Sequence, residues 1–589
     1  MQEKIKTYIL EHENELLFVV LLTLIGAYLR FHTLDWGVPF LHPDEHNIGI
    51  SVNKLRFPSQ LNPDFFAYGS LPIYLIYFLG IIRQFFMGAV TWNISGDQAI
   101  LVGRFLSAFL ATSLIPITYI ALKKLSFSST LTMVGTIMTT FMIGFIQFSH
   151  FATFEMFLTF TYFVIFLIAV QTLKTDKLSW YLILGMLTGA SVGAKVVSLF
   201  LIGLPPMIWL FNHDKAMKDQ NDSLIVRVIK SSFVFPFLNI KVLGNYLLVA
   251  IAFLLTNPFA ILDYPNFSRW ISNENGIATG NIPVFYTRGF IETTPVFYQM
   301  KHVFPFISGY LFTIIGTVAV FFLLWKVMKS KSNSQLVMSI FLYIFLGYSV
   351  FHLSLYVKWI RYMVPALPLL MVGLLYLFSW IKEKIPHWAY LIIITIFTTE
   401  IVWRGLSFFQ IYQHTDNRVE AALWAEQNLP QEIQLMVDPA DNSVLPFNNV
   451  FPTQIYSFNF YELDGPNATA TLEELADNLV DAAYYLVPTQ RVYHNAFRLQ
   501  AQFPKAARFY ETLFSGELGF KNIYLATKKD CLLPESWWRD SKNILVYAVC
   551  PINFDDAEET FVVFDHPTPQ LFEKTTSYTK EEYLKILQP

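Results

Sequence analysis

The sequence predicts a multi-pass α-helical membrane protein of about eleven spans with a C-terminal extracytoplasmic α/β domain. Three observations lead to this fold class. Apolar residues make up 54% of the 589-residue chain and charged residues only 14%, and the mean hydropathy is +0.43, well above the soluble average. Apolar runs long enough to span a bilayer recur as far as residue 406. Beyond that point, short strand-like runs alternate with amphipathic helices.

The expected spans start with an anchor at 16–34, because no small-residue cleavage site follows this apolar run. The other expected spans are 100–122, 129–148, 155–173, 178–193, 196–211, 243–262, 304–327, 335–356, 363–380 and 387–406. The run 71–90 is ambiguous, since it opens with Leu71-Pro72 and contains Arg83. If it does not cross, all lysine-rich loops fall on the cytoplasmic side, as the positive-inside rule requires. We therefore expect 71–90 to be a juxtamembrane or re-entrant helix. The N-terminus is then cytoplasmic and the C-terminal domain extracytoplasmic, in a plasma-membrane protein.

The chain is expected to divide into a transmembrane catalytic domain, 1–406, and an extracytoplasmic α/β domain, 407–589. The strand-like runs of the second domain are 433–437, 482–487, 523–526, 544–549 and 560–564, and its helical runs are 418–428 and 495–513. The second helical run is expected to bend or restart at Pro504. Cys531 and Cys550 lie near each other in this domain and can pair outside the cytoplasm, but two thiols make neither a metal framework nor a redox motif.

An acidic pair, Asp44-Glu45, follows the first apolar run within the motif His42-Pro-Asp-Glu-His46. Carboxylates held at the membrane surface are costly to keep ionised unless they are used, so the pair is a candidate for proton abstraction. The alternative is a helix start, because Pro43-Asp44-Glu45 ahead of Ile48 is typical of a first helical turn. The residues alone leave both interpretations open.

Several cations and a second carboxylate fall on the same predicted outer face as this pair. Glu155 follows His150 at the mouth of one span, and Lys195 lies at the junction of two apolar runs. The other outer cations are Lys358, Arg361 and Arg288. A single interfacial cation usually extends its side chain to the lipid headgroups. Several cations on one face favour a site for an anionic, phosphate-bearing lipid. The net charge of −3 indicates no basic surface for nucleic acid.

Longer motifs along nearly the whole chain point to one family. They are Arg30 with His42–Glu45, Asn62–Pro72, Gly103–Ala108, Ser149–Glu155, Lys358–Tyr362, Gly516–Phe520 and Phe564–Pro567. With these motifs the chain resembles the membrane-embedded glycosyltransferases of the GT-C fold. The resemblance is to the branch of glycosyltransferase family 39-like proteins that includes protein O-mannosyltransferases and the lipid A aminoarabinose transferase. The acidic pair in the first outer loop is fairly specific for the fold but not for the sugar.

The resemblance implies an inverting transfer of a sugar from a polyprenyl-phosphate carrier to an acceptor protein, lipid or glycan. By this match Asp44 is the general base, Glu45 orients the site, and Glu155 fills the second acidic position of the outer loops. The donor phosphate is held by Lys195, Lys358, Arg361, Arg104 and Arg288. The chain departs from many relatives at Gly69-Ser70-Leu71-Pro72, where they carry a basic residue before a Pro-Pro pair. The phosphate contact that those relatives make with this basic residue must then be made by another residue here, for example Arg56 or Arg104.

No cofactor and no catalytic metal are expected. His42, Asp44, His46, His150 and Glu155 are usable ligand types for a divalent ion. However, relatives that modify hydroxyl groups generally need no metal, and His42 and His46 are better explained as interfacial hydrogen-bonding residues.

Two other functions use similar features. A transporter or flippase of lipid-linked sugars also needs many spans and interfacial cations, but such proteins commonly show inverted repeats and helices broken at mid-membrane. Here the informative polar residues gather at one face, which favours an enzyme. A sensor or assembly protein whose outer domain binds a partner is the third possibility. Of these three kinds of protein, only the enzyme consumes the lipid-linked sugar donor, so donor consumption distinguishes them.

Overall fold

The computed structural model describes residues 13–37, 41–88, 91–213, 237, 239–329, 334–438, 443–526 and 556–588. The chain forms two compact units. The first unit comprises the chain up to Leu34, Asn47–Ile282 and Thr293–Leu406. The second comprises Asp35–His46, Pro283–Glu292 and the chain from Ser407 onward. The acidic pair Asp44-Glu45 therefore belongs to the second unit.

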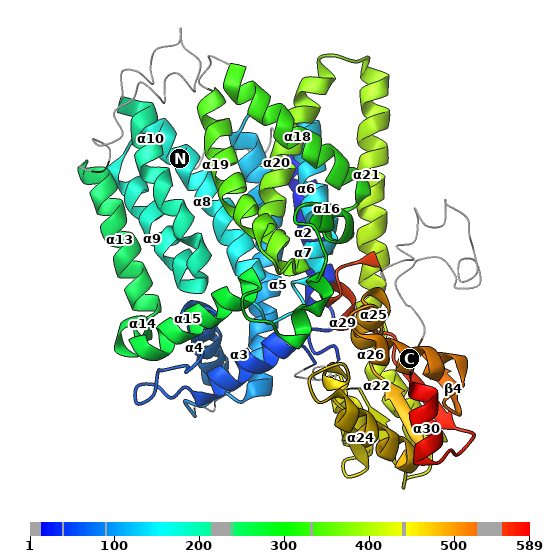
Figure 1. Ribbon diagram of the computed structural model, residues 1–589. Coiled ribbons are helices and arrows are strands. Elements are labelled where there is room, and N and C mark those ends of the chain that lie inside the picture. Colours follow the sequence, from blue (N-terminus) through cyan, green and yellow to red (C-terminus); the bar gives the residue numbers. More distant parts are fainter. Residues whose placement is uncertain are drawn as a thin grey trace. The chain divides into compact units, whose positions relative to one another are not determined.

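The first unit is a bundle of apolar helices (Figure 1). In the described part of the chain, eight helical stretches are long and apolar enough to cross a membrane: Glu13–Phe31, Gly96–Lys124, Glu155–Thr175, Val196–His213, Tyr310–Lys329, Gln335–Ser354, Ile360–Lys382 and His387–Asn428. They correspond to α2 (Glu13–Phe31), α5 (Gly96–Lys124), α8 (Glu155–Thr175), η1 (Val196–Gly203) with α10 (Leu204–His213), α18 (Tyr310–Lys329), α19 (Ser334–Ser354), η4 (Ile360–Ala366) with α20 (Leu367–Lys382), and a stretch that starts with α21 (His387–Phe409). The protein is thus a multi-pass α-helical membrane protein.

The expected number of eleven spans is not confirmed, for two reasons. The expected spans 178–193 and 243–262 are the 17-residue apolar helices α9 (Leu178–Ala194) and α13 (Ile240–Thr256). The expected span 129–148 is broken into α6 (Ser129–Phe141) and α7 (Ile143–Gln147), because Met142 between them has extended backbone with ψ 122°.

A stripe of small residues brings α9 and α13 together. Gly185, Gly189 and Gly193 recur every four residues along α9 and so share one helix face. A Cβ atom at Gly185 or Gly189 would lie 2.5 Å from a backbone carbonyl oxygen of α13. Small residues allow the two backbones to approach closely. Inside a bilayer no hydrophobic effect drives helices together, so the van der Waals packing made possible by this approach stabilises the pair. The stripe leads along α9 towards its C-terminal end, where Lys195 follows.

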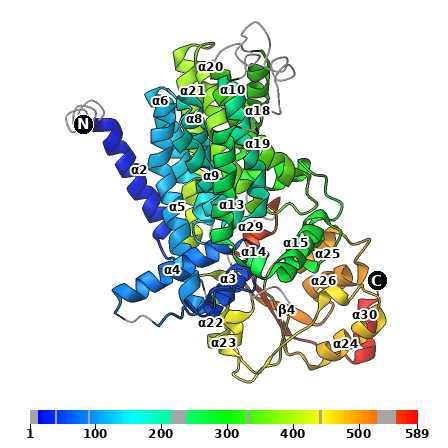
Figure 2. The ribbon, with the colours of Figure 1, turned by 90° about the vertical axis from the view of Figure 1, so that its left-hand side faces the viewer.

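Three helices lie at the same end of the bundle in both views: α4 (Ser70–Phe86), α14 (Phe259–Leu262) and α15 (Tyr264–Thr279) (Figures 1 and 2). Helix α4 buries Ile73, Ile76 and Tyr77 but exposes Phe85 and Phe86 at 69% and 82%. A helix at a membrane boundary needs such an exposed apolar face. The expectation that 71–90 does not cross the membrane stays a prediction.

The second unit contains a five-stranded sheet in the order β2-β1-β3-β5-β4. The strands are β1 (Leu435–Val437), β2 (Ile455–Ser457), β3 (Tyr484–Val487), β4 (Phe520–Leu525) and β5 (Gln570–Lys574). Strand β1 pairs in parallel with β2 and β3, whereas β5 pairs antiparallel with β3 and β4. The helices of this unit are α22 (Asn417–Asn428), α23 (Leu445–Val450), α24 (Ala468–Asp481), α25 (Arg491–Arg498), α26 (Pro504–Ser515), α29 (Thr560–Val563) and α30 (Lys580–Leu587), with most of them labelled in Figures 1 and 2.

The sequence analysis found part of this unit and missed the strands β2 and β5 and the helices α23, α24 and α30. The strands near 433–437, 482–487 and 523–526 are confirmed as β1, β3 and β4, the helix at 418–428 as α22, and the restart at Pro504 as the start of α26. The strand expected at 560–564 is wrong, because these residues form the buried helix α29, which begins where the Glu558 carboxylate accepts a hydrogen bond from the Thr560 backbone N–H at 3.2 Å. The strand expected at 544–549 and the cysteines Cys531 and Cys550 lie outside the described residues.

A buried carboxyl group follows β1. Asp438 has no exposed surface, and its two oxygens accept hydrogen bonds from the hydroxyls of Tyr485 and Tyr510, the latter at 2.6 Å. Burial raises the pKa of Asp438 to about 7, because the two hydroxyls compensate only part of the lost hydration. The folded state therefore holds this proton more tightly than the unfolded chain, whose Asp pKa is about 3.9.

We expect this carboxyl group to make the second unit less stable as the pH rises. Its contribution is complete below about pH 4, is lost progressively up to about pH 7 and stays lost above it, with a total on the order of 4 kcal/mol. Asp438→Asn should remove this pH dependence. Hydrogen exchange of β1, β3 and α26 in the full-length protein, with wild type and variant compared at each pH, measures it. Parallel profiles for the two proteins between pH 4 and 7 would contradict the prediction.

Candidate functional site

A cavity of about 380 Å³ lies within the first unit. Its wall combines the loop 66–69, the start of η1, one face of α15, the end of α19 and the segment 355–362. The polar lining residues are Tyr68, Lys195, Asn257, Glu274, Asn275, His352, Trp359, Arg361 and Tyr362. Most of the remaining wall is apolar. Two of the five predicted phosphate-binding residues, Lys195 and Arg361, therefore meet in one cavity.

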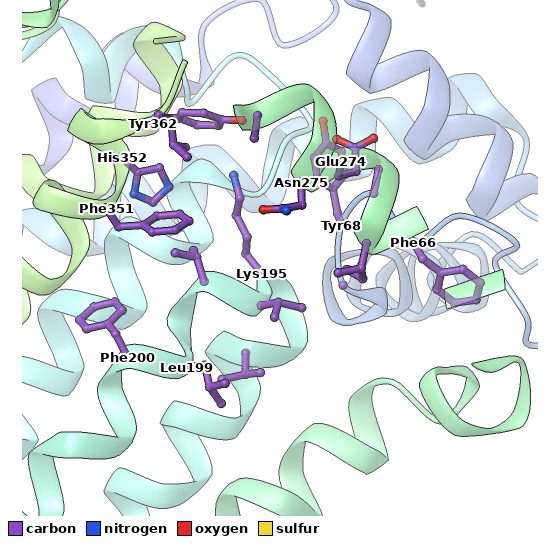
Figure 3. A pocket seen from close by; sticks show the side chains of 18 of the residues that line it. Phe66, Tyr68, Lys195, Leu199, Phe200, Glu274, Asn275, Phe351, His352 and Tyr362 are labelled. Carbon is purple, nitrogen blue, oxygen red and sulfur yellow. The ribbon is translucent and has the colours of Figure 1, made fainter. Parts of the chain in front are cut away.

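Lys195 projects into the middle of this cavity. It lies between α9 and η1, outside both helices, with extended backbone at φ −154° and ψ 124°. Its side chain points into the space between His352 and Tyr362 on one side and Asn275 and Glu274 on the other (Figure 3). The ammonium nitrogen lies 4.3 Å from the ring centroid of Tyr362 and 4.8 Å from that of Phe154. Burial lowers the pKa of Lys195 to about 8, although the charges of Glu155 and Glu274 act against this shift.

The backbone before Lys195 is fixed by close packing against the loop 66–69 that precedes α4. The Gly69 N–H donates to the carbonyl of Ala194 at 3.0 Å, and a Cβ at Gly69 would lie 2.0 Å from the carbonyl oxygen of Gly193. Asn257 closes this arrangement, since it accepts from the Ser70 N–H at 2.6 Å and donates to the Gly193 carbonyl at 3.1 Å. Many relatives carry a basic residue at Gly69-Ser70-Leu71-Pro72. In this chain the backbone of that segment holds Lys195 in position instead.

We expect Gly69→Ala to disturb this contact strongly. The new methyl group meets backbone rather than a flexible side chain, so the loop or the end of α9 must shift, at a cost of about 1–3 kcal/mol. The variant should unfold at a lower temperature in detergent than wild type. Gly244→Ala is the control for added volume, because a Cβ at Gly244 of α13 meets only flexible side chains, the nearest that of Leu182 at 3.1 Å. Equal unfolding temperatures for Gly69→Ala and wild type would contradict the expectation.

Glu155 is buried at the start of α8. Its exposed fraction is 2%, and the Thr153 side chain interacts with its carboxylate. Its charge interacts with that of Lys195. A buried carboxylate is costly unless an opposite charge compensates it. Glu155 is therefore an electrostatic partner of the cavity lysine.

Arg361 and Lys358 lie close together in sequence but in different surroundings. Arg361 lines the cavity, and its guanidinium carbon lies 4.6 Å from the ring centroid of Trp359. Lys358 is 2% exposed, does not line the cavity, and donates to the carbonyl of Tyr356 at 2.6 Å. Burial lowers the pKa of Lys358 to about 8.

Arg104 and Arg288 do not line the cavity either. The Arg104 guanidinium donates to the carbonyl of Leu34 at 2.9 Å. Arg288, in the second unit, donates to the carbonyl of Tyr461 at 2.7 Å and lies 4.3 Å from the ring of Phe503. As phosphate ligands, both stay predictions.

Asp44 and Glu45 form the first turn of α3 (Pro43–Lys54), so the helix start expected as an alternative is present. Asp44 is half-buried and its backbone N–H donates to Nδ1 of His42 at 3.1 Å, whereas Glu45 is fully buried. The His42 ring lies 4.1 Å from the ring of Phe564, which belongs to the motif Phe564–Pro567. A helix start does not exclude proton abstraction, and the role of Asp44 stays a prediction.

A buried ion pair supports the motif Phe564–Pro567 within the second unit. Arg418 and Asp416 have no exposed side-chain surface, and the nearest nitrogen and oxygen are 2.6 Å apart. Arg418 also donates to the carbonyl of Phe564 at 2.9 Å, and Tyr412 donates to the Asp565 carboxylate at 2.8 Å. These contacts fix the segment on which His42 packs.

The sequence analysis missed Glu274 and Asn275. Both lie on α15, between the expected spans 243–262 and 304–327, where the sequence analysis expected no helix. The lining residues of this helix are Phe267, Ile271, Glu274, Asn275 and Ala278, a spacing that places them on one face. This helical periodicity was the signal available in the sequence.

No protein-family model and no curated protein matches the chain. Among solved structures, it is similar to the oligosaccharyltransferase of Archaeoglobus fulgidus tethered to an acceptor peptide with the NVT sequon, with 13% identity, a TM-score of 0.49, and coverage of 96% of this chain and 89% of the other. A structure of the same protein with Zn and sulfate has 13% identity, a TM-score of 0.43 and coverage of 95% and 88%. ArnT from Cupriavidus metallidurans in the apo state has 13% identity, a TM-score of 0.40 and coverage of 83% and 95%. Both proteins are glycosyltransferases of the GT-C fold, the fold that the sequence motifs resemble.

Proposed function

We propose that the protein is an integral membrane glycosyltransferase that moves a sugar from a polyprenyl-phosphate donor to an acceptor on the outer face of the membrane, with inversion at the anomeric carbon. The observation that carries this proposal is the cavity in which Lys195 and Arg361 meet an apolar wall. Cations bind a phosphate, and a guanidinium can do so with two parallel hydrogen bonds. The apolar wall suits an isoprenoid chain.

The apolar part of the cavity continues to exposed surface. Val196, Leu199, Phe200 and Phe351 line the cavity, and Val196 and Leu199 are 37% and 48% exposed. Apolar side chains exposed on a membrane helix contact lipid, so this side of η1 gives an isoprenoid chain a path from the bilayer to the cations. A donor with a charged head and a long apolar tail therefore fits the cavity better than a soluble nucleotide sugar.

In the proposed reaction the acceptor oxygen forms a bond with the anomeric carbon while the bond from that carbon to the phosphate oxygen breaks. Asp44 takes the acceptor proton, and Glu45 orients the site. The leaving group is polyprenyl phosphate, whose charge Lys195 and Arg361 stabilise as it develops. Glu155 keeps Lys195 in its charged form. Lys358, Arg104 and Arg288 are proposed as further phosphate contacts.

The test is consumption of donor by the purified protein in detergent. A panel of polyprenyl-phosphate sugars is incubated with hydroxyl-bearing protein, lipid and glycan acceptors, and the release of polyprenyl phosphate is measured. An enzyme releases it, whereas a flippase or a sensor leaves every donor intact. Movement of intact donor across vesicles without release would overturn the proposal.

We expect this activity to need no metal ion. This expectation rests on the resemblance to relatives that modify hydroxyl groups, which generally need no metal. Exhaustive chelation should then leave the rate of polyprenyl phosphate release within about twofold of the untreated rate. Loss of activity on chelation that manganese or magnesium restores would contradict this expectation.

A further inference from the structure

One wall of the cavity carries polar groups that the proposed reaction does not use. Glu274 and Asn275 lie next to each other on α15, and both line the cavity (Figure 3). Among the described residues, neither side chain makes a hydrogen bond or an ion pair; the Glu274 carboxylate interacts with Lys195 only through charge. The carboxylate is half-buried, so it has lost part of its hydration without gaining donors in return.

Other polar groups in the wall are already engaged by the protein. Asn257 uses its side chain to hold the backbone at Ser70 and Gly193. His352 places Nδ1 at 2.9 Å from the carbonyl of Tyr348. Glu274 and Asn275 thus differ from these residues, because their hydrogen-bonding groups face the cavity without a protein partner in the described part.

The chemistry of the two side chains selects the ligand part that they meet. A carboxylate repels a phosphate, so Glu274 does not face the charged end of the donor. It accepts hydrogen bonds at two oxygens, and an amide such as that of Asn275 both donates and accepts. Neighbouring hydroxyl groups on a ring offer the matching donors and acceptors. The aromatic side chains of Tyr68, Trp359 and Tyr362 line the same cavity and offer flat apolar surfaces for the ring itself.

We propose that Glu274 and Asn275 bind the hydroxyl groups of the donor sugar and determine which sugar is accepted. The inference rests on the proposed function, since it takes Lys195 and Arg361 as the phosphate site. The sugar then lies on the α15 side of Lys195, and the isoprenoid chain lies on the η1 side. The substrate class is a neutral sugar with adjacent hydroxyl groups, joined through phosphate to an isoprenoid.

The experiment compares binding of a sugar-free lipid phosphate with binding of its glycosylated forms. Farnesyl phosphate and its mannosyl, glucosyl and galactosyl esters are titrated against full-length protein in detergent by calorimetry. Wild type should bind at least one glycosylated form more tightly than the others. Glu274→Gln should weaken binding of that form by about ten- to a hundredfold, since it loses charged hydrogen bonds. Binding of farnesyl phosphate should stay equal or become tighter, because a repelling charge is gone. Asn275→Ala should weaken the same form by about tenfold or less.

The sugar-free arm separates the possible failures. Asn273→Ala is the matched control, since Asn273 is an exposed residue of the same helix that does not line the cavity. Retained binding of farnesyl phosphate by Glu274→Gln shows that the variant is folded. Equal loss of binding for all four ligands would mean that Glu274 acts only through Lys195, and unchanged binding of all four would mean that it contacts no sugar; either result overturns the inference. If wild type does not bind farnesyl phosphate, the phosphate site of the proposed function fails, and the inference fails with it.

Discussion

Asp44→Asn should bind the lipid-linked donor as tightly as wild type but transfer its sugar about 10²- to 10⁴-fold more slowly. The amide keeps the size of the carboxyl group and most of its hydrogen bonds, but it cannot take the acceptor proton. The first turn of α3 should survive, because Asp44 lies inside that turn and the loss of one negative charge near a helix N-terminus costs only about 0.3–1 kcal/mol. The loss is therefore expected in kcat and not in the Kd of the donor.

Asp64→Asn is the matched control for this change. Asp64 lies shortly after α3, and its exposed carboxylate pairs with Lys54 at 2.9 Å. An exposed ion pair contributes little, so this variant should transfer sugar at the wild-type rate. Single-turnover transfer and donor binding are measured for both variants, together with their unfolding temperatures. A near wild-type rate for Asp44→Asn would show that Asp44 only starts the helix.

The bundle was predictable from sequence wherever the length of an apolar run decides the structure. The breaks within runs were not, since they depend on residues far away. The expected span 304–327 begins only at Tyr310, because Gly309 adopts φ +99° and the Tyr310 N–H donates to the distant Glu400 at 3.0 Å. The strand expected at 560–564 failed for a related reason. A short run of β-branched and aromatic residues suits a buried helix as well as a strand.

The lining of the cavity was predictable in part. Lys195 and Arg361, which line it, were expected as phosphate contacts because cations beside apolar runs are rare and conspicuous. Lys358 was expected beside Arg361, yet it precedes η4, which begins at Ile360, so the two do not share a helix face. Glu274 lies in a polar stretch where one more carboxylate has no distinguishing mark. Only the packing of α15 against the cavity brings it near Lys195.

Lys195→Ala should weaken binding of farnesyl phosphate by about a hundredfold, because it removes a desolvated cation from the phosphate site. Lys195→Arg should retain most of the affinity. The change is expected in the Kd of the donor and, since the same charge stabilises the leaving phosphate, also in kcat. Lys241→Ala is the matched control, because Lys241 forms its ion pair with Asp176 and does not line the cavity. It should bind farnesyl phosphate like wild type.

The pH dependence of binding provides a sharper test of the same lysine. The pKa of Lys195 is lowered to about 8 by burial, so the free protein loses this charge as the pH rises through that value. Wild-type affinity for farnesyl phosphate should be highest near pH 7, where the phosphate, with a second pKa of about 6, is a dianion and Lys195 is still charged, and it should fall above pH 8 by up to about tenfold per pH unit. Lys358, whose pKa is also lowered to about 8, is the other group that can produce this profile. Lys195→Arg should keep its affinity up to pH 10, because a guanidinium stays charged there, whereas Lys358→Arg should still show the wild-type decline. If Lys195→Arg declines with pH as wild type does, Lys195 is not the cation that holds the phosphate.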